Sequence, residues 1–551
     1  MPVLAVARNV VSAIRLLEVV ALFGDDPRVR IHWTIAPGSA FSAETDGYLT
    51  RVGVRLTPWE RACEREYALI MATSANGDLD RLSGPLMLLP HGAGYSRVVA
   101  LGQSAPAGLA PGQLVRAGRV IAQVVGLEHE DQRARLATYC PEAAPLGVVL
   151  GDPTRDRMAH GARLRGLYRG ALAVPDRCAL VVMSSTWGPG SLLAAHPDLP
   201  AQLAAALPFD EYRLAAIVHP NAAARMGAWE VGRLLLRARS SGLQLVPPDR
   251  WEGAILAADL VIGDHGSVSL YAAAAGTGVL FGAYDGAQIV PGSPMAELAA
   301  RIPRLDPRGD LASQVRAGLA QDTQGHAYRQ ARDAFGAVGR SLEVTGQVAY
   351  RILGLVPPSR CVGVRAPEPV SRGADARASH LVLVGRDPSG RVDLVVRRFA
   401  PGIDPDLLAG YEAAEVCRHL AVGEFELDMT VRENAEVLVL GHAADLRPVG
   451  KALAAALARE AGCLRVASAV TGPGRCVAVV RGLDAVELEA EDPGLDAGVL
   501  PSVLVAVAAL EHGDPAAAVK RLRTGVRVLV GGAASVVTAY DAASVQPSRP
   551  R

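Results

Sequence analysis

The stretch Asp259–Phe281 reads DLVIGDHGSVSLYAAAAGTGVLF and is the best guide to the fold of the whole chain. Its apolar beginning, Leu260 to Ile262, predicts the end of a buried strand, and its alanine-rich second half predicts a helix that stops at Gly276. Between them lies the polar turn from Gly263 to Ser267. A strand, a glycine-containing turn and a helix N-terminus bring backbone N–H groups together, which favours an anion such as phosphate. The same residues also fit an ordinary strand-to-helix connection closed by a capping side chain.

Length and composition narrow the class of protein. A chain of 551 residues is too long for one core and predicts two or three domains. Half of the residues are hydrophobic and a fifth are charged, as in globular proteins. Lysine plus arginine and aspartate plus glutamate number 56 each, so the formal net charge is zero and we expect no nucleic-acid partner.

The cysteines and the apolar segments bear on the compartment. The seven cysteines are dispersed without a C-x-x-C pair, which favours reduced thiols over disulfides or a zinc site. The first residues lack the features of a signal peptide, and no apolar run reaches the length of a transmembrane helix. We therefore expect a cytoplasmic protein without a metal site, and peripheral contact with the inner membrane face stays open.

The order of strand and helix patterns predicts the fold class. Residues 1–145 alternate strand and helix signals, and residues 146–355 do so again, which predicts two Rossmann-like, doubly wound parallel sheets. Residues 356–378 are rich in proline, glycine and charge and predict a linker. Residues 379–545 predict a smaller α/β or α+β domain of unknown role. Within that domain a hairpin is expected around Asp387–Gly390, and a helix near 406–420.

Polar residues follow several of the predicted strands. Parallel sheets gather ligands at the carboxyl ends of their strands, so these residues are candidate site residues. In the second sheet hydroxyl, imidazole and amide groups suit a nucleotide diphosphate donor. In the first sheet a histidine lies across the expected cleft and could act as a general base at neutral pH. The candidates are His91 and His219 for catalysis, Ser185, Thr186, Trp187, Asp264, His265, Gly266 and Ser267 for donor binding, and Arg97 and Arg155 for phosphate contact.

Each candidate also has an ordinary structural interpretation. His91 can be a structural or solvated histidine, and the His219-Pro220 pair can simply end a strand. Trp187 can be a packing residue, since tryptophan more often packs against other side chains than stacks on a nucleotide base. Arg155 can belong to a capped helix start.

The order of these motifs resembles the CDP-glycerol glycerophosphotransferase family. The resemblance rests on His91-Gly92, Gly151-x-Pro153-x-Arg155-Asp156, Ser185-Thr186-Trp187, His219-Pro220 and the stretch from Asp259 to Tyr271, and it covers about residues 1–350. It implies a GT-B fold, in which two Rossmann-like domains face each other across a cleft. It also implies transfer of an alditol phosphate from a CDP-linked donor to a hydroxyl, without an obligatory metal in the chemical step.

The resemblance also implies residue roles. His91 matches the family's base, His219 the histidine near the donor phosphate, Asp264 and Ser267 the turn that holds the diphosphate, and Thr186 and Trp187 the start of the donor domain. We therefore expect a transferase with a nucleotide-activated donor, CDP- or UDP-linked, that needs no further cofactor. The acceptor would be a polyol, a glycan or a lipid-linked polymer. A sugar donor, a nucleotide-sugar epimerase and a non-catalytic scaffold of the same fold stay open as alternatives.

Overall fold

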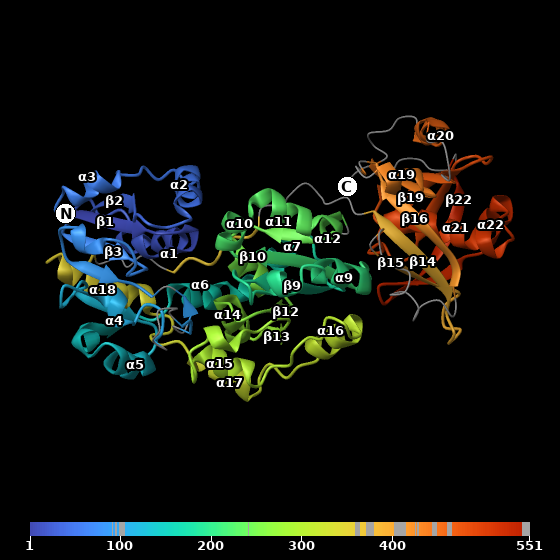
Figure 1. The fold of residues 1–551 in the computed structure, drawn as a ribbon. Helices are drawn as coiled ribbons and strands as arrows, with labels where there is room; N and C mark the ends of the chain where they lie inside the picture. The colour runs from blue at the N-terminus through green and yellow to red at the C-terminus, as the bar shows by residue number, and fades with distance from the viewer. Residues whose placement is uncertain are drawn as a thin grey trace.

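Three domains follow one another along the chain (Figure 1). They are seen in a computed structural model that describes residues 1–542 except for short gaps, namely 91, 94–95, 99–104, 241, 359–363, 371–378, 400, 402–414, 425, 427–428, 443–448 and 460–464. The first two domains are parallel α/β sheets covered by helices, and a third domain follows, so the predicted fold class is confirmed. The first two domains together have the GT-B arrangement.

The first domain is built on a parallel sheet of strand order β2-β1-β3-β4-β7-β8. Its centre is apolar, and β1 and β3 are almost wholly buried. Close packing constrains the sheet at Gly126, where a Cβ atom would lie 2.7 Å from the carbonyl oxygen of Leu88. The elements are β1 (Pro2–Ala7), α1 (Val10–Val20), β2 (Arg30–Ile35), α2 (Ser42–Arg51), α3 (Trp59–Cys63), β3 (Leu69–Ala72), β4 (Leu86–Leu88), α4 (Pro111–Leu114), β5 (Val115–Arg116), β6 (Arg119–Val120), β7 (Val124–Leu127), α5 (Asp131–Tyr139) and β8 (Gly147–Val149).

The second domain has a parallel sheet of order β11-β10-β9-β12-β13. The chain runs outward from β9 through β10 to β11 and then returns to the other side of β9 with β12. The order therefore reverses between β9 and β12, and such a switch point is where open α/β sheets bind ligands. The elements are α6 (Pro153–Gly161), α7 (Arg165–Ala171), β9 (Ala179–Ser185), α8 (Leu192–Ala195), α9 (Leu199–Ala206), β10 (Tyr212–Val218), α10 (Pro220–Met226), α11 (Ala228–Leu234), α12 (Leu236–Ser240), β11 (Gln244–Val246), α13 (Trp251–Ala257), β12 (Leu260–Gly263), α14 (Ser267–Ala275), β13 (Gly278–Phe281), α15 (Pro294–Ala299), α16 (Leu311–Leu319) and α17 (His326–Asp333).

The border between these domains differs from the expected one at residue 145. Strand β8 pairs with β7 and so belongs to the first sheet. Helix α18 (Ser341–Ile352) also returns to the first domain, where the ring of Tyr350 packs 5.7 Å from that of Phe23 (Figure 1). Local sequence periodicity carries no information on the sheet against which a strand or a helix packs.

The third domain is a sheet whose strands close into a ring in the order β14-β15-β21-β22-β20-β19-β18-β17-β16. The apolar helix α21 packs against the inner side of this ring and is buried over most of its length. The predicted hairpin is confirmed, because β14 and β15 pair antiparallel around Asp387–Gly390. The helix predicted near 406–420 is wrong for its last residues, because the strand β16 begins at Glu415 and lies between β14 and β17. The earlier part of the predicted helix falls in residues 402–414, which lie outside the described residues. The elements are β14 (His380–Arg386), β15 (Leu394–Phe399), β16 (Glu415–Gly423), α19 (Met429–Glu433), β17 (Val437–His442), α20 (Val449–Arg459), β18 (Val466–Gly472), β19 (Arg475–Val480), β20 (Val486–Ala490), α21 (Leu500–Leu510), α22 (Pro515–Leu522), β21 (Val526–Val530) and β22 (Ala533–Asp541).

The third domain docks on the second one at the end where β9 and β10 begin. The guanidinium of Arg398 forms a buried ion pair with Asp210 and a second one, at 2.7 Å, with Asp496. The ring of His380 packs 4.6 Å from that of Phe209. The candidate ligand-binding edge lies at the opposite, carboxyl end of these strands.

The expected linker also packs on the second domain in its described part. The hydroxyl of Tyr168 donates to the carbonyl oxygen of Pro367 at 2.9 Å, and Glu368 pairs with Arg250 at 2.7 Å. Residues 359–363 and 371–378 of the predicted linker lie outside the described residues. Across the described chain, no single helix is long and apolar enough to cross a membrane, and only the bent pair Ala497–Leu510 and Pro515–Leu522 passes that test together.

Candidate functional site

Two loops meet at the switch point of the second sheet, and the carboxylate of Asp264 holds them together. Its Oδ2 accepts hydrogen bonds from the backbone N–H groups of Thr186 and Leu192, both at 2.8 Å. Its Oδ1 accepts one from the N–H of Gly266 at 2.9 Å. Burial raises the pKa of Asp264 to about 6, against the lowering effect of these donors. The residue therefore fixes the loop after β9 against the turn after β12, and its predicted contact with a donor stays a prediction.

Helix α14 begins directly after this turn with exposed backbone donors. Gly266 is its N-cap residue and provides no capping side chain, while Ser267 is exposed. The first N–H groups of a helix have no partner inside the helix, so those of Ser267 and Val268 point out of the N-terminus. Because the helix dipole adds positive charge there, this end can bind an anion.

The end of β4 in the first domain lies opposite this helix. A Cβ atom placed on Gly92 would lie 3.7 Å from Ser267 Oγ, so the chain after β4 closely approaches the start of α14. His91, the predicted base, lies outside the described residues. Its role stays a prediction, although its neighbour Gly92 is at the site.

The loop after β9 is shaped by Ser185 and contacts the first domain through Trp187. Ser185 Oγ accepts from the N–H of Leu193 at 3.0 Å and donates to the carbonyl oxygen of Thr186 at 3.1 Å. The guanidinium of Arg97 lies 4.6 Å from the centre of the Trp187 ring, and the Phe41 ring packs edge-on at 6.0 Å. Both of these partners come from the first domain, so Trp187 lies in the interface between the two domains.

Arg97 is also bonded to the second domain. Its Nη2 donates to Gln288 Oε1 at 3.0 Å, and the adjacent N–H of Val98 donates to the carbonyl oxygen of Gln288 at 2.9 Å. Burial lowers the pKa of Arg97, while the negative charge of Asp264 raises it, which places the guanidinium within electrostatic reach of the turn.

The two histidines predicted in the second domain take different positions. His219 is the N-cap residue of α10: its Nδ1 accepts from the N–H of Asn221 at 3.1 Å, and its own N–H donates to the carbonyl oxygen of Ser185 at 3.0 Å. His265 is buried behind the turn, and its Nδ1 accepts a long hydrogen bond, 3.4 Å, from the N–H of Asp285. Burial and then Arg97 lower the pKa of His265, so this imidazole is neutral at pH 7. The structure therefore brings Ser185, Thr186, Trp187, Arg97, His219 and the 263–267 turn together at one edge.

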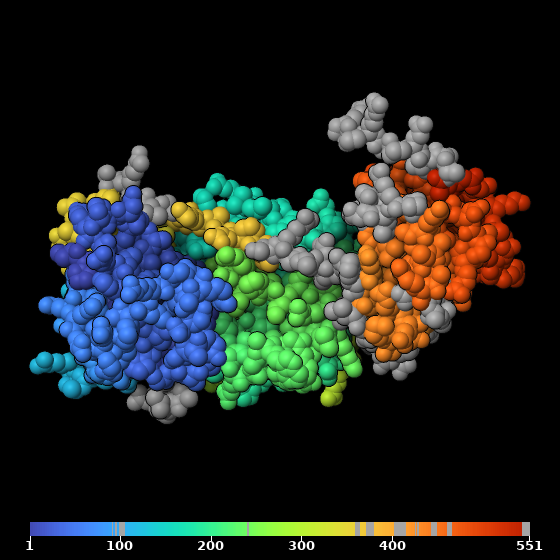
Figure 2. All heavy atoms as spheres, turned by 90° about the horizontal axis from the view of Figure 1, so that it is seen from above, coloured from blue at the N-terminus to red at the C-terminus, as the bar shows by residue number. Residues whose placement is uncertain are grey.

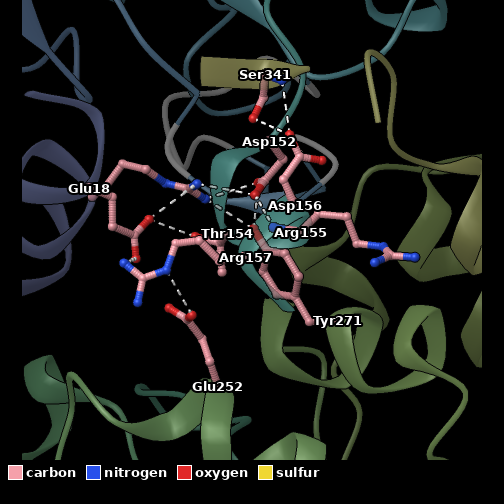
Figure 3. Close-up of polar contacts among 10 residues, drawn as sticks. Glu18, Asp152, Thr154, Arg155, Asp156, Arg157, Glu252, Tyr271 and Ser341 are labelled. Atoms are coloured by element: carbon pink, nitrogen blue, oxygen red, sulfur yellow. Dashed lines mark hydrogen bonds and ion pairs between the residues drawn. The ribbon is translucent and has the colours of Figure 1, made fainter. Parts of the chain in front are cut away.

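The negative charges that act on Arg155, the other predicted phosphate contact, are chiefly those of Asp156 and Asp152, which do not belong to this group. Arg155 lies on α6, and in Figure 3 its side chain extends away from Glu18 and Glu252. Its Nε is buried without a partner among the described residues, and burial lowers its pKa.

A buried polar network that the sequence did not reveal joins the two domains beside the site (Figure 3). Arg15 of α1 donates to both carboxylate oxygens of Asp152, at 3.1 and 2.9 Å, and to the hydroxyl of Tyr271 at 3.0 Å. The Tyr271 hydroxyl donates in turn to Asp152 at 2.6 Å. Burial opposes ionisation of Asp152, but the Arg15 guanidinium lowers the pKa of its carboxyl below the ordinary value. Since Tyr271 lies on α14, this network fixes the helix whose N-terminus forms the candidate site.

Further charged residues extend the network. Arg157 lies 3.6 Å from Glu18 and 3.3 Å from Glu252, and Thr154 donates to Glu18 at 2.8 Å. Burial and the nearby Glu18 raise the pKa of Glu252 well above its usual range. Asp152 occupies an unspecified position within the Gly151–Asp156 motif, whereas Arg15 and Glu18 resemble polar positions of an ordinary amphipathic helix. No signal in one sequence shows that they meet residues more than 130 positions away.

Among the described residues, no group of three or more His, Cys, Asp or Glu side chains is placed to hold a metal ion.

Comparison with known proteins gives structural likeness only. No family model matches the chain, and no curated protein matches it. The wall teichoic acid polymerase TagF is similar with a TM-score of 0.46 and 13% identity, over 64% of this chain and 89% of that chain. A UDP-GlcNAc 2-epimerase from Neisseria meningitidis bound to UDP-GlcNAc is similar with a TM-score of 0.39 and 11% identity, over 64% and 100%. The S. aureus MnaA–UDP co-structure scores 0.41 with 11% identity, over 65% and 99%.

The structural likeness is thus partial and covers 64% of this chain.

Proposed function

We propose that the chain is a transferase that uses a nucleotide diphosphate-activated donor, most like a CDP-alditol phosphate transferase. One observation carries the proposal: the switch point of the second sheet holds a helix N-terminus without a side-chain cap, opposite the strand end of the first domain. A diphosphate matches such a site in charge and in hydrogen-bonding capacity. The acceptor would be a hydroxyl of a polyol, a glycan or a lipid-linked polymer.

The residues around the helix N-terminus would divide the work. The N–H groups of Ser267 and Val268 and the Ser267 hydroxyl would bind phosphate oxygens, and Arg97 would add positive charge. Asp264 would keep the turn in place before the donor arrives, which lowers the ordering cost of binding. His219, fixed by its capping hydrogen bond beside Ser185, would approach the donor phosphate from the neighbouring strand.

The transfer step follows from these positions. His91, in its predicted role as base, would take the proton of the acceptor hydroxyl. A bond would form between that oxygen and the distal phosphorus while the bond from this phosphorus to the bridging oxygen breaks. With a CDP-linked donor, CMP would leave and the alditol phosphate would pass to the acceptor.

Nucleotide binding is the first test. Thermal unfolding of the full chain is measured with CDP, UDP, GDP, ADP and CMP, and one nucleotide present at a hundred times its Kd should add about 2.7 kcal/mol of stability. Ser267→Glu should abolish the shift by placing a carboxylate at the phosphate position. Ser313→Glu, at the exposed first turn of α16, is the matched control and should keep the shift. The absence of a shift with every nucleotide would contradict the proposal.

Turnover is the second test. With CDP-glycerol and a hydroxyl acceptor, CMP release should be lost in His91→Ala while the nucleotide-induced thermal shift is kept. Unchanged CMP release after joint substitution of His91 and His219 by alanine would rule out the mechanism. A shift and a product specific to UDP-linked donors would move the assignment to sugar transfer or epimerisation.

A further inference from the structure

A buried cluster at the boundary between the first two domains holds three carboxyl groups and two guanidinium groups. Its members are Arg15 and Glu18 of α1, Asp152, Arg157 of α6 and Glu252 of α13 (Figure 3). The side chains of the three acidic residues are at most 6% exposed. If all five groups were ionised, the cluster would keep one net negative charge away from water, which is costly.

The three carboxyl groups are not equally well paired. Asp152 accepts two hydrogen bonds from Arg15, and Glu18 accepts one from the hydroxyl of Thr154 at 2.8 Å. Glu252 has a guanidinium nitrogen 3.3 Å from its Oε2, but this oxygen is buried and has no hydrogen-bond partner among the described residues. A carboxyl group in such a position is more stable with a proton than without one.

Glu18 is the acceptor that a protonated Glu252 requires. The two carboxyl groups are close enough for a hydrogen bond between their side chains. Burial and then the charge of Glu18 raise the pKa of Glu252 well above its usual range. One proton held between the two carboxyl groups also brings the net charge of the cluster to zero. We call Glu18 and Glu252 the carboxyl pair.

The carboxyl pair spans two domains that are joined by a narrow connection. The chain passes from the first domain to the second after β8 and returns before α18. These two passages lie side by side, because a Cβ atom on Gly151 would lie 2.7 Å from the carbonyl oxygen of Gly336. Paired passages of this kind can act as a hinge. Figure 2 shows the first domain, in blue, directly against the second domain, in green, so the structure is the closed form.

We propose that the carboxyl pair links the closure of the first two domains to one proton: the domains stay closed while the pair holds it and part when it is lost. Without the proton, two carboxylates from different domains would face each other in a dry interface and repel each other. Opening at the hinge would bring both into water. The candidate site lies between the same domains, so its assembly would depend on this proton. Closure is measured without nucleotide and does not rest on the proposed transfer reaction.

The other charged and titratable groups that face the pair do not titrate in a way that explains such an opening. They are Arg15 of α1, Tyr48 of α2, Arg157 of α6, Tyr168 of α7, Tyr271 of α14 and Glu368 of the linker. Burial raises the pKa of all three tyrosines, that of Tyr48 to about 12, so they stay neutral up to pH 10. The arginines stay charged throughout this range, while Glu368 is exposed and Arg225, the charged residue of α10, is exposed as well.

Asp264 is another buried carboxyl group beside the cleft, but its ionisation acts in the opposite direction. Burial raises the pKa of Asp264 to about 6, and its charged form attracts Arg97 of the first domain. A rise in pH would therefore favour closure through Asp264 and opening through the carboxyl pair. An opening at high pH thus points to the pair.

Small-angle X-ray scattering of the full chain, without nucleotide and from pH 5 to 10, tests the proposal. The radius of gyration should rise with pH and return to its first value when the pH is lowered again. Because one proton is released, the ratio of closed to open molecules should fall tenfold per pH unit above the midpoint. Far-UV circular dichroism should stay constant, since the domains part without unfolding.

Two variants should remove the pH dependence. Glu252→Gln can still donate a hydrogen bond to Glu18 but has no proton to lose, so it should stay closed at every pH. Glu18→Gln leaves two carboxylates with two guanidinium groups, which balance without a bound proton, so it should also stay closed. Glu297→Gln removes an exposed ion pair with Arg301 on α15 and, as the matched control, should open like the wild type.

Three results would overturn the proposal. One is a radius of gyration of the wild type that does not change from pH 5 to 10. Another is an opening of Glu252→Gln or Glu18→Gln at the same pH as the wild type. The third is a loss of secondary structure in the wild type that accompanies the increase in size, because the chain would then unfold instead of opening at its hinge.

Discussion

The buried contact between Arg15 and Asp152 makes a quantitative prediction about the stability of the two-domain unit. In Asp152→Asn one carboxylate oxygen becomes an NH2 group that faces Arg15 Nη2 and the Tyr271 hydroxyl, 2.9 and 2.6 Å from the original oxygen. The other oxygen keeps its contact with Arg15 Nη1 and still caps α6 through the N–H of Arg155, at 2.8 Å. Helix capping is therefore preserved, and the variant isolates the charge.

The expected magnitude follows from burial. Arg15 is 6% exposed and Asp152 1%, so the guanidinium would lose its main counter-ion without access to water. Breaking a buried ion pair by removing one partner costs about 3–5 kcal/mol, and we expect a loss of that size in the free energy of unfolding. Removing the second charge as well, in Arg15→Met with Asp152→Asn, should restore part of it. The double variant should therefore cost at least about 2 kcal/mol less than the sum of the single ones.

Urea unfolding followed by tryptophan fluorescence measures this unit selectively. All five tryptophans lie between Trp33 and Trp251, within the first two domains, and the ring of Trp251 packs 5.2 Å from that of Tyr271. Glu230→Gln removes an exposed ion pair on α11 and should leave the midpoint unchanged. A cost below about 1 kcal/mol for Asp152→Asn, or strict additivity in the double variant, would refute the reasoning.

Two further predictions concern Asp264 and the domain junction. The pKa of Asp264 is raised from 3.8 to about 6, so its contribution to stability is fully present below pH 4 and is lost as the pH rises through 6. The loss is on the order of 3 kcal/mol. The measurement is the difference in unfolding free energy between wild type and Asp264→Asn from pH 4 to 8, which should change by that amount and then level off. A difference that does not change with pH would contradict the prediction. At the junction, a Cβ on Gly531 would lie 2.2 Å from the carbonyl oxygen of Asp210, whereas one on Gly532 meets nothing within 4 Å. Both glycines have positive φ, so Gly532→Ala should cost only the left-handed backbone strain of roughly 1–2 kcal/mol. Gly531→Ala should in addition loosen the docking of the third domain on the second and increase hydrogen exchange at residues 208–213. Equal exchange in the two variants would show that this contact does not determine the docking.

Local sequence patterns accounted for much of the fold. Strand-to-helix alternation predicted the two parallel sheets, because the period of a buried strand and that of an amphipathic helix are visible within ten residues. The turn residues Asp387–Gly390 likewise predicted a hairpin, which β14 and β15 form. The helix expected near 406–420 is wrong where the chain forms β16. A short apolar segment has the same pattern in a helix and in a strand that is paired on both sides, as β16 is.

The predicted site residues of the second domain lie close together, whereas their roles in binding and catalysis stay predictions. Ser185, Thr186, Trp187, His219 and the 263–267 turn lie at one edge, because each is at the carboxyl end of a strand of the same parallel sheet or directly follows it. That Asp264 binds three backbone N–H groups depends on the spacing between two loops 78 residues apart, which no local pattern records.

The sequence by itself determined the strands, the turns that follow them and the chemical groups that those turns offer, since all of these depend on neighbours along the chain. The tertiary structure alone decided which domain β8 and α18 join, which charges are buried together, and which helices remain uncovered. Arg15 and Asp152 lie 137 residues apart, and Trp229 has the same local pattern whether its outer side is buried or exposed. Burial and pairing are properties of the packed chain, because they depend on which distant surfaces meet when the whole chain minimises its exposed apolar area.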